Sequence, residues 1–188
     1  MILSLNTLDY NVFKFINGFV KQNPILDYTM IFFAEYAQYF LMICLLILWI
    51  LNKKGKLVVL QTILACSTAF TINKVLGLFF YRDRPFISHF DINQLVEHAA
   101  NSSFPSDHAT SAFVIGITLW LYYKKRLGAI LLISACLIAF SRVWVGVHYP
   151  LDVLAGVIIG CTTALSIHYF FQTQLAKEII CKFILKEK

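Results

Sequence analysis

Three ionisable residues lie close together in the C-terminal half of the chain. Arg142, His148 and Asp152 belong to the stretch Ser-Arg-Val-Trp-Val-Gly-Val-His-Tyr-Pro-Leu-Asp, between two long apolar runs. Charged side chains are costly near hydrocarbon, so this stretch indicates either a turn that faces water or a functional site. A neutral histidine can attack phosphorus, an aspartate can orient its ring, and an arginine can bind phosphate oxygens. The stretch alone leaves both interpretations open.

A second polar stretch, Ser103–His108, opens another apolar run. We expect Ser106 or Asp107 to cap a helix that begins there, with Pro105 just outside it. The free N–H groups of a helix N-terminus favour an anion. His108, in the first turn, could donate a proton to a leaving phosphate, although capping alone would account for Ser106 and Asp107.

A third stretch, Arg82-Asp83-Arg84-Pro85, follows an apolar run that ends with Lys74 in its last turns. The planar fork of an arginine matches phosphate oxygens, so two arginines here could hold a diphosphate or anchor to lipid headgroups. Glu35 lies about two turns into the first apolar run, where it should face a protein interior. It is expected to partner a basic residue or to form an interhelical hydrogen bond.

The composition is that of a polytopic membrane protein. The 188 residues are 59% hydrophobic and only 14% charged, with a mean hydropathy of +0.72, whereas soluble domains are about 25% charged. The length suggests one domain. The five cysteines show no metal-type spacing and predict no disulfide framework. The net charge of +6 would suggest nucleic acid as a partner of a soluble protein, so the basic residues must first be compared with the membrane topology.

The elements that position these stretches are predicted to be helices, which makes the chain an all-α membrane bundle. Residues 1–23 form an amphipathic helix that lies in the interface rather than crossing as a sixth, poorly apolar span. The bundle covers residues 25–172, and residues 173–188 form a basic cytoplasmic tail. A polar segment, residues 81–105, holds a short helix around residues 93–100. Five apolar runs are long enough to cross hydrocarbon of about 30 Å: residues 25–51, 57–80, 106–123, 127–146 and 150–171.

The basic residues indicate how these helices are oriented. Three lie in the loop at residues 52–56, three in the loop at residues 124–126 and four in the tail, which is ten of the 16 Lys and Arg. With five crossings all ten fall on one side, which the positive-inside rule makes cytoplasmic. Membrane topology therefore explains the charge without nucleic acid. The same topology places the three polar stretches together on the outer face, which favours a site over separate interfacial turns.

Taken together, the stretches resemble the motifs of the phosphatidic acid phosphatase type 2 superfamily of membrane phosphatases. Those motifs are Lys-x6-Arg-Pro, Pro-Ser-Gly-His and Ser-Arg-x5-His-x3-Asp. The third is complete here, the second has Asp107 in place of Gly, and the first keeps Arg84 and Pro85 but has Gly77 in place of Lys. Lys74 or Arg82 would replace that lysine, and Arg82 is the better placed. The residues that match the third motif are Ser141, Arg142, His148 and Asp152.

The resemblance is strongest to the bacitracin-resistance branch, whose members are undecaprenyl-diphosphate phosphatases. It implies that His148 is the nucleophile and forms a phosphohistidine, that Asp152 orients it, and that His108 protonates the leaving lipid phosphate. The phosphate oxygens would be bound by Arg84, Arg142 and Ser106. No metal or other cofactor is implied. The implied setting is a bacterial cytoplasmic membrane, with the site facing outward, a polyprenyl diphosphate as substrate and membrane lipids as surroundings.

Two other functions stay open at this stage. The chain could hydrolyse another lipid, such as phosphatidylglycerol phosphate or phosphatidate, or it could be a non-catalytic lipid-binding protein of the same fold. Asp107 would either stabilise the imidazolium of His108 or face away from the phosphate. Among the remaining polar and aromatic residues, His89 and His98 are expected to be solvated in the outer loop, and His168 to pack between helices. Trp144, Tyr149 and Tyr81 are expected to form an interfacial aromatic belt.

Overall fold

A computed structural model describes residues 2–51, 53–122 and 125–174. Over that part of the chain the structure contains eight helices and no strand, which confirms the predicted all-α class. The predicted basic tail lies almost wholly outside the described residues. The helices are α1 (Ile2–Asn17), α2 (Pro24–Glu35), α3 (Ala37–Leu51), α4 (Lys53–Phe79), α5 (Pro85–Ser88), α6 (Asp107–Tyr122), α7 (Lys125–Trp144) and α8 (Pro150–Gln172).

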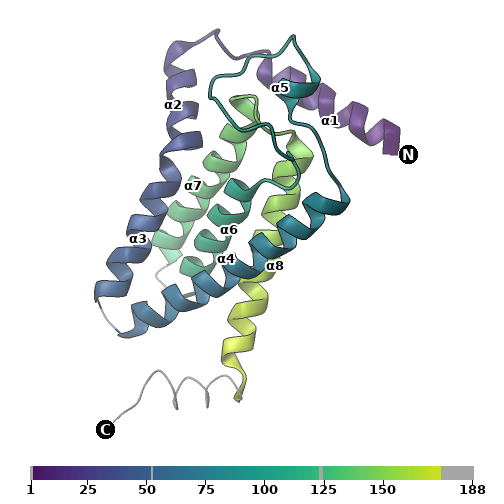
Figure 1. The fold of residues 1–188 in the computed structure, drawn as a ribbon. Helices are drawn as coiled ribbons and strands as arrows, with labels where there is room; N and C mark the ends of the chain where they lie inside the picture. Colours follow the sequence, from purple (N-terminus) through teal and green to yellow (C-terminus); the bar gives the residue numbers. More distant parts are fainter. Residues whose placement is uncertain (1, 52, 123–124, 175–188) are drawn as a thin grey trace.

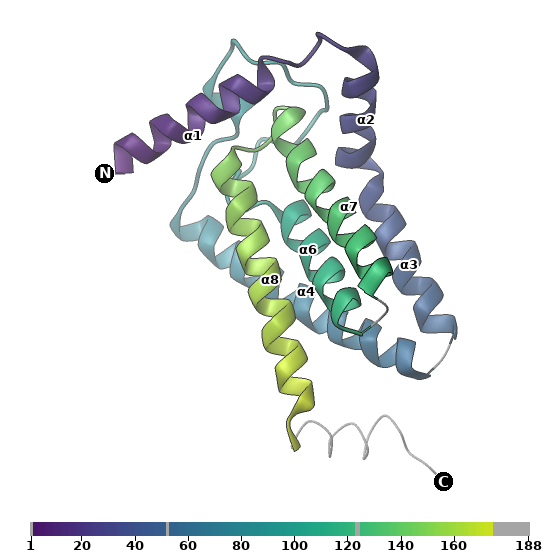
Figure 2. The same ribbon diagram turned by 180° about the vertical axis from the view of Figure 1, so that it is seen from behind.

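Helix α6 lies inside the bundle, between α4, α7 and α8 (Figures 1 and 2). Its approach to α8 is close because α8 presents glycines. A Cβ atom on Gly156 would lie 2.6 Å from the carbonyl oxygen of Ser106, and one on Gly160 would lie 2.5 Å from that of Thr110. Small residues allow helix backbones to pack this tightly in membranes. The contact brings the start of α8, with Asp152, against the start of α6: the Ser106 N–H donates to the Asp152 carbonyl at 3.0 Å.

Among the described residues, two helices are long and apolar enough to cross a membrane, namely α4 and α8. The pair α2 and α3 would be a third span, bent by 44° at the break between the helices. Helix α6 has only 16 residues, about 24 Å of helix, but other helices surround much of its length. Five full crossings therefore stay a prediction, while the helical membrane bundle itself is confirmed.

Three local predictions were wrong. The first apolar run is not one helix, because α2 ends at Glu35 and α3 begins at Ala37. The basic loop before the second run is instead the first turn of α4. Residues 93–100 are not helical, because the backbone N–H of Leu95 donates to Val145 at 3.1 Å and Asn93 exchanges hydrogen bonds with Asn17. These tertiary contacts override the local helical tendency, and the short helix of this segment is α5.

Helix α1 lies at the site end of the bundle and extends away from it (Figures 1 and 2). Its apolar residues Leu8 and Phe15 are 60% and 70% exposed, as expected of a face that meets lipid. Its buried stripe, however, contains the polar residues Asp9 and Asn17 together with Phe13. The polar face of this amphipathic helix therefore meets protein, not only water.

Candidate active site

The three polar stretches meet at one end of the bundle, as predicted. The Nη1 atom of Arg84 donates to the carbonyl of Val147 at 2.9 Å, which joins the first stretch to the third. The Ser103 hydroxyl donates to Asp152, which joins the second stretch to the third. The backbone N–H of Ser103 also donates to the carbonyl of Arg82 at 2.8 Å, which joins the second stretch to the first.

His148 lies in the turn between α7 and α8 and is only 2% exposed. The turn begins with Gly146, whose φ of +84° is costly for other residues. A Cβ there would also lie 2.7 Å from the carbonyl oxygen of Asn93. The N–H groups of Val147 and His148 then both donate to the carbonyl of Arg142 at 3.2 Å. The Gly-Val-His sequence therefore folds back on the end of α7 and holds the imidazole in the site.

The two ring nitrogens of His148 have different partners. Nε2 lies 3.1 Å from Nη1 of Arg84, and Nδ1 lies 3.7 Å from Oδ2 of Asp152 and 3.5 Å from the Ser103 hydroxyl. A guanidinium can only donate hydrogen bonds, so this contact requires a lone pair on Nε2 and places the proton of the neutral ring on Nδ1. Nε2 is thus the nitrogen able to attack an electrophile.

Burial lowers the pKa of His148 to about 4, although the hydrogen-bonding interaction with Asp152 opposes the decrease. The imidazole is therefore neutral at pH 7 and keeps its lone pair. The Nδ1–Oδ2 distance exceeds hydrogen-bond length, and such contacts often shorten when a substrate binds.

Asp152 lies in the first turn of α8 and is fully buried. Its Oδ2 accepts the backbone N–H of Tyr149 at 2.9 Å and the hydroxyl of Ser103. Its Oδ1 accepts Nη1 of Arg82 at 2.9 Å. These donors fix the carboxylate four residues after His148, on the same face of the chain. Ser103 belongs to the second stretch, but nothing in the sequence assigned it a role.

Arg142 and Ser106 carry donors that nothing in the described part of the chain satisfies. The Nη1 atom of Arg142 donates to the carbonyl of Ala34 at 2.8 Å and lies 3.5 Å from Glu35. Its Nε and Nη2 atoms are buried and have no hydrogen-bond partner among the described residues, and neither does Oγ of Ser106. Buried polar atoms are nearly always paired, so these donors suit an anionic ligand. We call Arg142, Ser106 and Arg84 the phosphate cradle.

The break between α2 and α3 provides a hydrogen-bond acceptor for Arg142 of the cradle. A helix that ends leaves its last carbonyls without intrahelical partners, and the carbonyl of Ala34 is one that Arg142 occupies. Glu35, at the same end, lies 3.5 Å from Arg142, which agrees with one of its two predicted roles, the partner of a basic residue. Its side chain is 40% exposed, however, and does not face a protein interior as expected. Arg84 is held on another side, where its Nε and Nη2 atoms donate to Oδ1 of Asn101 at 3.0 and 2.8 Å.

His108 lies in the first turn of α6, as predicted, and is half-buried. Sequence analysis gave no role to His98, but its ring centroid lies 6.4 Å from that of His148. Burial and the nearby Arg84 lower the pKa of His98. His98 and His89 are both half-buried in the outer loop, and His89 stacks on Tyr10 with ring centroids 4.1 Å apart.

Arg82 does not point into the cradle. Its Nη1 atom contacts Asp152, and its Nη2 atom lies 2.7 Å from Oδ2 of Asp9 in α1. The guanidinium also lies 3.7 Å from the ring centroid of Tyr149. We call Asp9, Arg82 and Asp152 the carboxylate clamp. Asp9 could not be identified from the sequence, because nothing local distinguishes it from the other polar residues of an amphipathic helix.

Lys74 and Asp107 border a neighbouring cavity of about 530 Å³. Lys74 is exposed on α4. Asp107 accepts a hydrogen bond of 2.7 Å from Asn73, and so is engaged with α4. The expected side-chain cap by Ser106 is absent among the described residues, since its Oγ has no partner there. Ser141 is buried and donates to the carbonyl of Ile138 in its own helix at 2.7 Å, away from the cradle.

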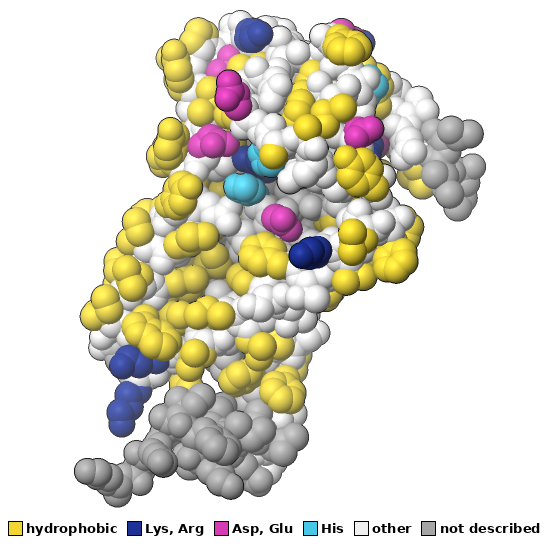
Figure 3. All heavy atoms as spheres, viewed as in Figure 1, with side chains coloured by type: hydrophobic (Ala, Val, Ile, Leu, Met, Phe, Trp, Pro, Cys, Tyr) yellow, Lys and Arg dark blue, Asp and Glu magenta, His cyan; other side chains and the backbone are white. Residues whose placement is uncertain are grey.

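The predicted aromatic belt was wrong for two of its three members. Trp144 is buried and donates to Oδ1 of Asp27 at 2.9 Å, and Tyr149 is buried beneath Arg82. Tyr81 is exposed. His168 packs against Tyr122 with ring centroids 4.9 Å apart, as predicted. Figure 3 shows histidine side chains reaching the surface on the site face, with charged side chains around them and apolar ones below.

The sequence and the fold of this chain are similar to those of known proteins. The PAP2 superfamily model matches residues 56–176. A Bacillus licheniformis protein named bacitracin transport permease protein BcrC is 36% identical over 168 residues, covering 89% of this chain and 82% of the relative. Undecaprenyl-diphosphatase BcrC of Bacillus subtilis is 37% identical over 154 residues, covering 81% of this chain and 79% of the relative. The crystal structure of Aquifex aeolicus LpxE superposes with a TM-score of 0.76 at 33% identity, covering 86% of this chain and 95% of that one.

Proposed function

The chain belongs to the PAP2 superfamily, and from this membership we propose that it is an undecaprenyl-diphosphate phosphatase of the bacterial membrane. It hydrolyses undecaprenyl diphosphate to undecaprenyl phosphate and inorganic phosphate, which recycles the carrier lipid of cell-wall synthesis. The name of the B. subtilis relative supports the substrate. The observation that carries the chemistry is a buried, neutral His148 beside an arginine cradle with unpaired donors.

The reaction proceeds in two steps. Nε2 of His148 attacks the terminal phosphorus, and the bond from that phosphorus to the bridging oxygen breaks. His108 donates a proton to the bridging oxygen, so that undecaprenyl phosphate leaves and a phosphohistidine remains. A water molecule, deprotonated by His108, then attacks the phosphorus, and the phosphorus–nitrogen bond breaks to release phosphate and restore His148. Dividing one difficult displacement into two easier ones is the benefit of a covalent intermediate.

The cradle stabilises the transferred group. Arg84, Arg142 and Ser106 donate to the phosphoryl oxygens, and phosphoryl transfer depends mainly on such positioning and charge stabilisation. In the ligand-free site Nη1 of Arg84 contacts Nε2 of His148, so a bound phosphate replaces the imidazole as its acceptor. Asp152 faces Nδ1 and balances the positive charge that the ring acquires when Nε2 is phosphorylated.

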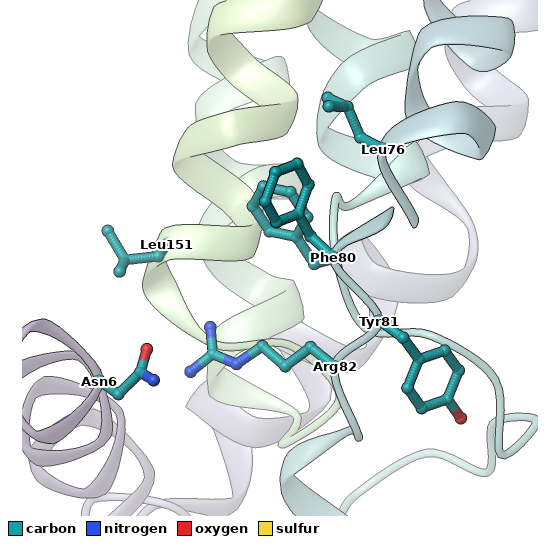
Figure 4. Close-up of a pocket in the computed structure, with 7 residues that line it drawn as sticks. Asn6, Leu76, Phe80, Tyr81, Arg82 and Leu151 are labelled. Carbon is teal, nitrogen blue, oxygen red and sulfur yellow. The ribbon is translucent and has the colours of Figure 1, made fainter. Parts of the chain in front are cut away.

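An apolar pocket of about 430 Å³ lies beside the site and suits part of the polyprenyl tail (Figure 4). Leu76, Phe80, Phe104 and Leu151 line it, together with Asn6, Tyr81 and Arg82. The pocket lies between the end of α4 and the starts of α1 and α8, so that a tail there places the diphosphate near the polar end of the bundle.

The site faces the exterior of the cell. The end of α3, the start of α4, the end of α6, the start of α7 and the end of α8 lie at the end of the bundle opposite the site (Figure 1). Basic residues predicted to be cytoplasmic lie in the first turns of α4 and α7, namely Lys53, Lys54, Lys56, Lys125 and Arg126. The orientation allows the enzyme to act on carrier lipid exposed at the outer surface, and its production in a bacterium is expected to raise tolerance to bacitracin.

The function is tested by phosphate release from the detergent-solubilised full chain. Undecaprenyl diphosphate, phosphatidylglycerol phosphate and phosphatidate are supplied separately, with EDTA, to the wild type and to His148→Ala. Fastest release from the isoprenoid, lost in the variant, supports the substrate and the nucleophile. Faster release from a glycerolipid overturns the substrate, and no release from any lipid by folded protein favours a non-catalytic lipid-binding protein.

A further inference from the structure

One buried stripe attaches α1 to the proposed active site. Asp9, Phe13 and Asn17 are spaced four residues apart, which places them on one face of the helix, and each is 3% exposed or less. Phe13 packs edge-on against Tyr149, with ring centroids 5.5 Å apart. The side chain of Asn17 donates to the carbonyls of Asn93 and Trp144 at 2.8 and 3.2 Å. Helix α1 is therefore fixed to the turn that carries His148.

Asp9 makes the contact closest to the chemistry. Its Oδ1 accepts the backbone N–H of Leu151 at 2.9 Å, in the first turn of α8. Its Oδ2 lies 2.7 Å from Nη2 of Arg82, whose Nη1 donates to Asp152 at 2.9 Å. Figure 4 shows Arg82 extending from the segment after α4 toward α1 and the start of α8. A single guanidinium thus connects α1 with the carboxylate that faces Nδ1 of His148.

The carboxylate clamp has a net negative charge only if Asp9 is present and ionised. Arg82 alone would neutralise Asp152 and leave little negative charge for the imidazole. With Asp9 also ionised, the clamp carries one net negative charge, which matches the positive charge of a phosphorylated His148 ring. Burial raises the pKa of Asp9, while the Leu151 N–H and Arg82 oppose the increase, and the guanidinium at 2.7 Å favours the ionised carboxylate.

We infer that Asp9 and Arg82 are positioning residues for the phosphatase reaction, and that α1 is part of the catalytic apparatus rather than only a membrane-surface helix. Asp9 holds Arg82 so that Asp152 keeps both its orientation and its negative charge toward His148. The family model begins at residue 56, so the match does not itself assign a role to Asp9. The inference rests on the proposed phosphatase function.

The decisive variant is Asp9→Asn, because the amide oxygen can still accept the Leu151 N–H while the charge is lost. We expect kcat to fall about tenfold, a moderate loss, because the removed unit charge acts on His148 through Arg82 and Asp152 rather than at contact distance. KM should stay within about twofold, because Asp9 touches no part of the bound phosphate. The rate of phosphoenzyme formation in a rapid-quench experiment should fall by the same factor as kcat, and Asp9→Glu should recover most of it.

A matched control is Asp91→Asn. Asp91 also joins α1 to the outer loop, through an ion pair of 2.8 Å with Lys14, but both side chains are exposed and neither contacts the clamp. It should keep wild-type kcat. The inference is overturned if Asp9→Asn keeps wild-type kcat, if Asp91→Asn loses as much, or if Asp9→Glu is no better than Asp9→Asn at equal thermal stability.

The ratio of the kcat of each variant to that of the wild type is measured on whichever lipid phosphate the wild type hydrolyses fastest. An unexpected preference for a glycerolipid then overturns the substrate while the ratio still tests Asp9. A wild type that hydrolyses none of the lipids overturns both the function and the positioning role. A tenfold loss in Asp9→Asn with active wild type supports both.

Discussion

Arg82 and Arg142 are used in opposite ways. In the carboxylate clamp, both terminal nitrogens of Arg82 contact carboxylates, from Asp9 and Asp152. In the phosphate cradle, Arg142 has two nitrogens, Nε and Nη2, without a partner among the described residues. Satisfied donors hold other groups in place, whereas buried unsatisfied donors await a ligand. The difference separates residues that position the nucleophile from residues that bind what it attacks.

The largest expected effect comes from removing the proposed nucleophile, His148. His148→Ala should reduce phosphate release to the level of buffer, a loss of at least about 10³-fold, because no other group supplies the nucleophile. The matched control is His89→Ala, which alters a histidine stacked on Tyr10 outside the cradle and should keep most activity. Equal losses in the two variants, with both proteins folded, would contradict the assignment.

The next effect distinguishes the two arginines directly. Arg142→Lys keeps the charge but loses the planar fork, so kcat/KM should fall about 100-fold and competitive inhibition by inorganic phosphate should weaken. Arg82→Lys should instead lower kcat with little change in phosphate inhibition. Steady-state kinetics of both variants with phosphate as inhibitor check this. If both variants changed kcat and phosphate inhibition in the same way, the cradle and the clamp would not have separate roles.

Removal of a single cradle hydroxyl should have a smaller effect. Ser106→Ala deletes a buried donor that has no partner among the described residues, so thermal stability should be unchanged. Loss of one hydrogen bond to a charged phosphate should reduce kcat/KM about tenfold. A thermal-shift assay beside the kinetics separates the two effects, and a large loss of stability with full activity would make Ser106 a packing residue.

The pH dependence gives the mildest test. Since burial lowers the pKa of His148 to about 4, its neutral form persists in the free enzyme well below the usual histidine value of about 6.5. Protonation removes the lone pair of Nε2, so the acidic limb of kcat/KM that belongs to His148 should fall as the pH decreases through about 4. A pH–rate profile measures this, and a limb assigned to His148 near 6.5 would indicate a solvated imidazole.

The same contrast explains what could be predicted from sequence. Arg84, Ser106 and Arg142 lie at the ends of apolar runs, and alternating helix directions bring those ends together. The local sequence therefore contains the information for the cradle. Asp9 lies 73 residues before Arg82, and only the packing of α1 against the turn at His148 brings the two together. Sequence analysis accordingly placed Arg82 among the phosphate ligands and did not identify Asp9.

The wrong predictions of helix boundaries have a similar origin. The break between α2 and α3 has no Pro or Gly to mark it, and its free carbonyl at Ala34 is used by Arg142, more than 100 residues later. The nonhelical path of residues 93–100 depends on contacts with Asn17 and Val145. In each case a distant partner, rather than the local sequence, determines the backbone.

The most direct test of His148 as nucleophile is isolation of the covalent intermediate. The full chain is mixed with undecaprenyl diphosphate labelled in its terminal phosphate, quenched in alkali within milliseconds, and digested for mass spectrometry. We expect an acid-labile, alkali-stable phosphate on His148 that forms with a rate constant at least equal to kcat. It should be absent from His148→Ala. A wild type that turns over without labelled protein, or that carries the label on another residue, would contradict the assignment.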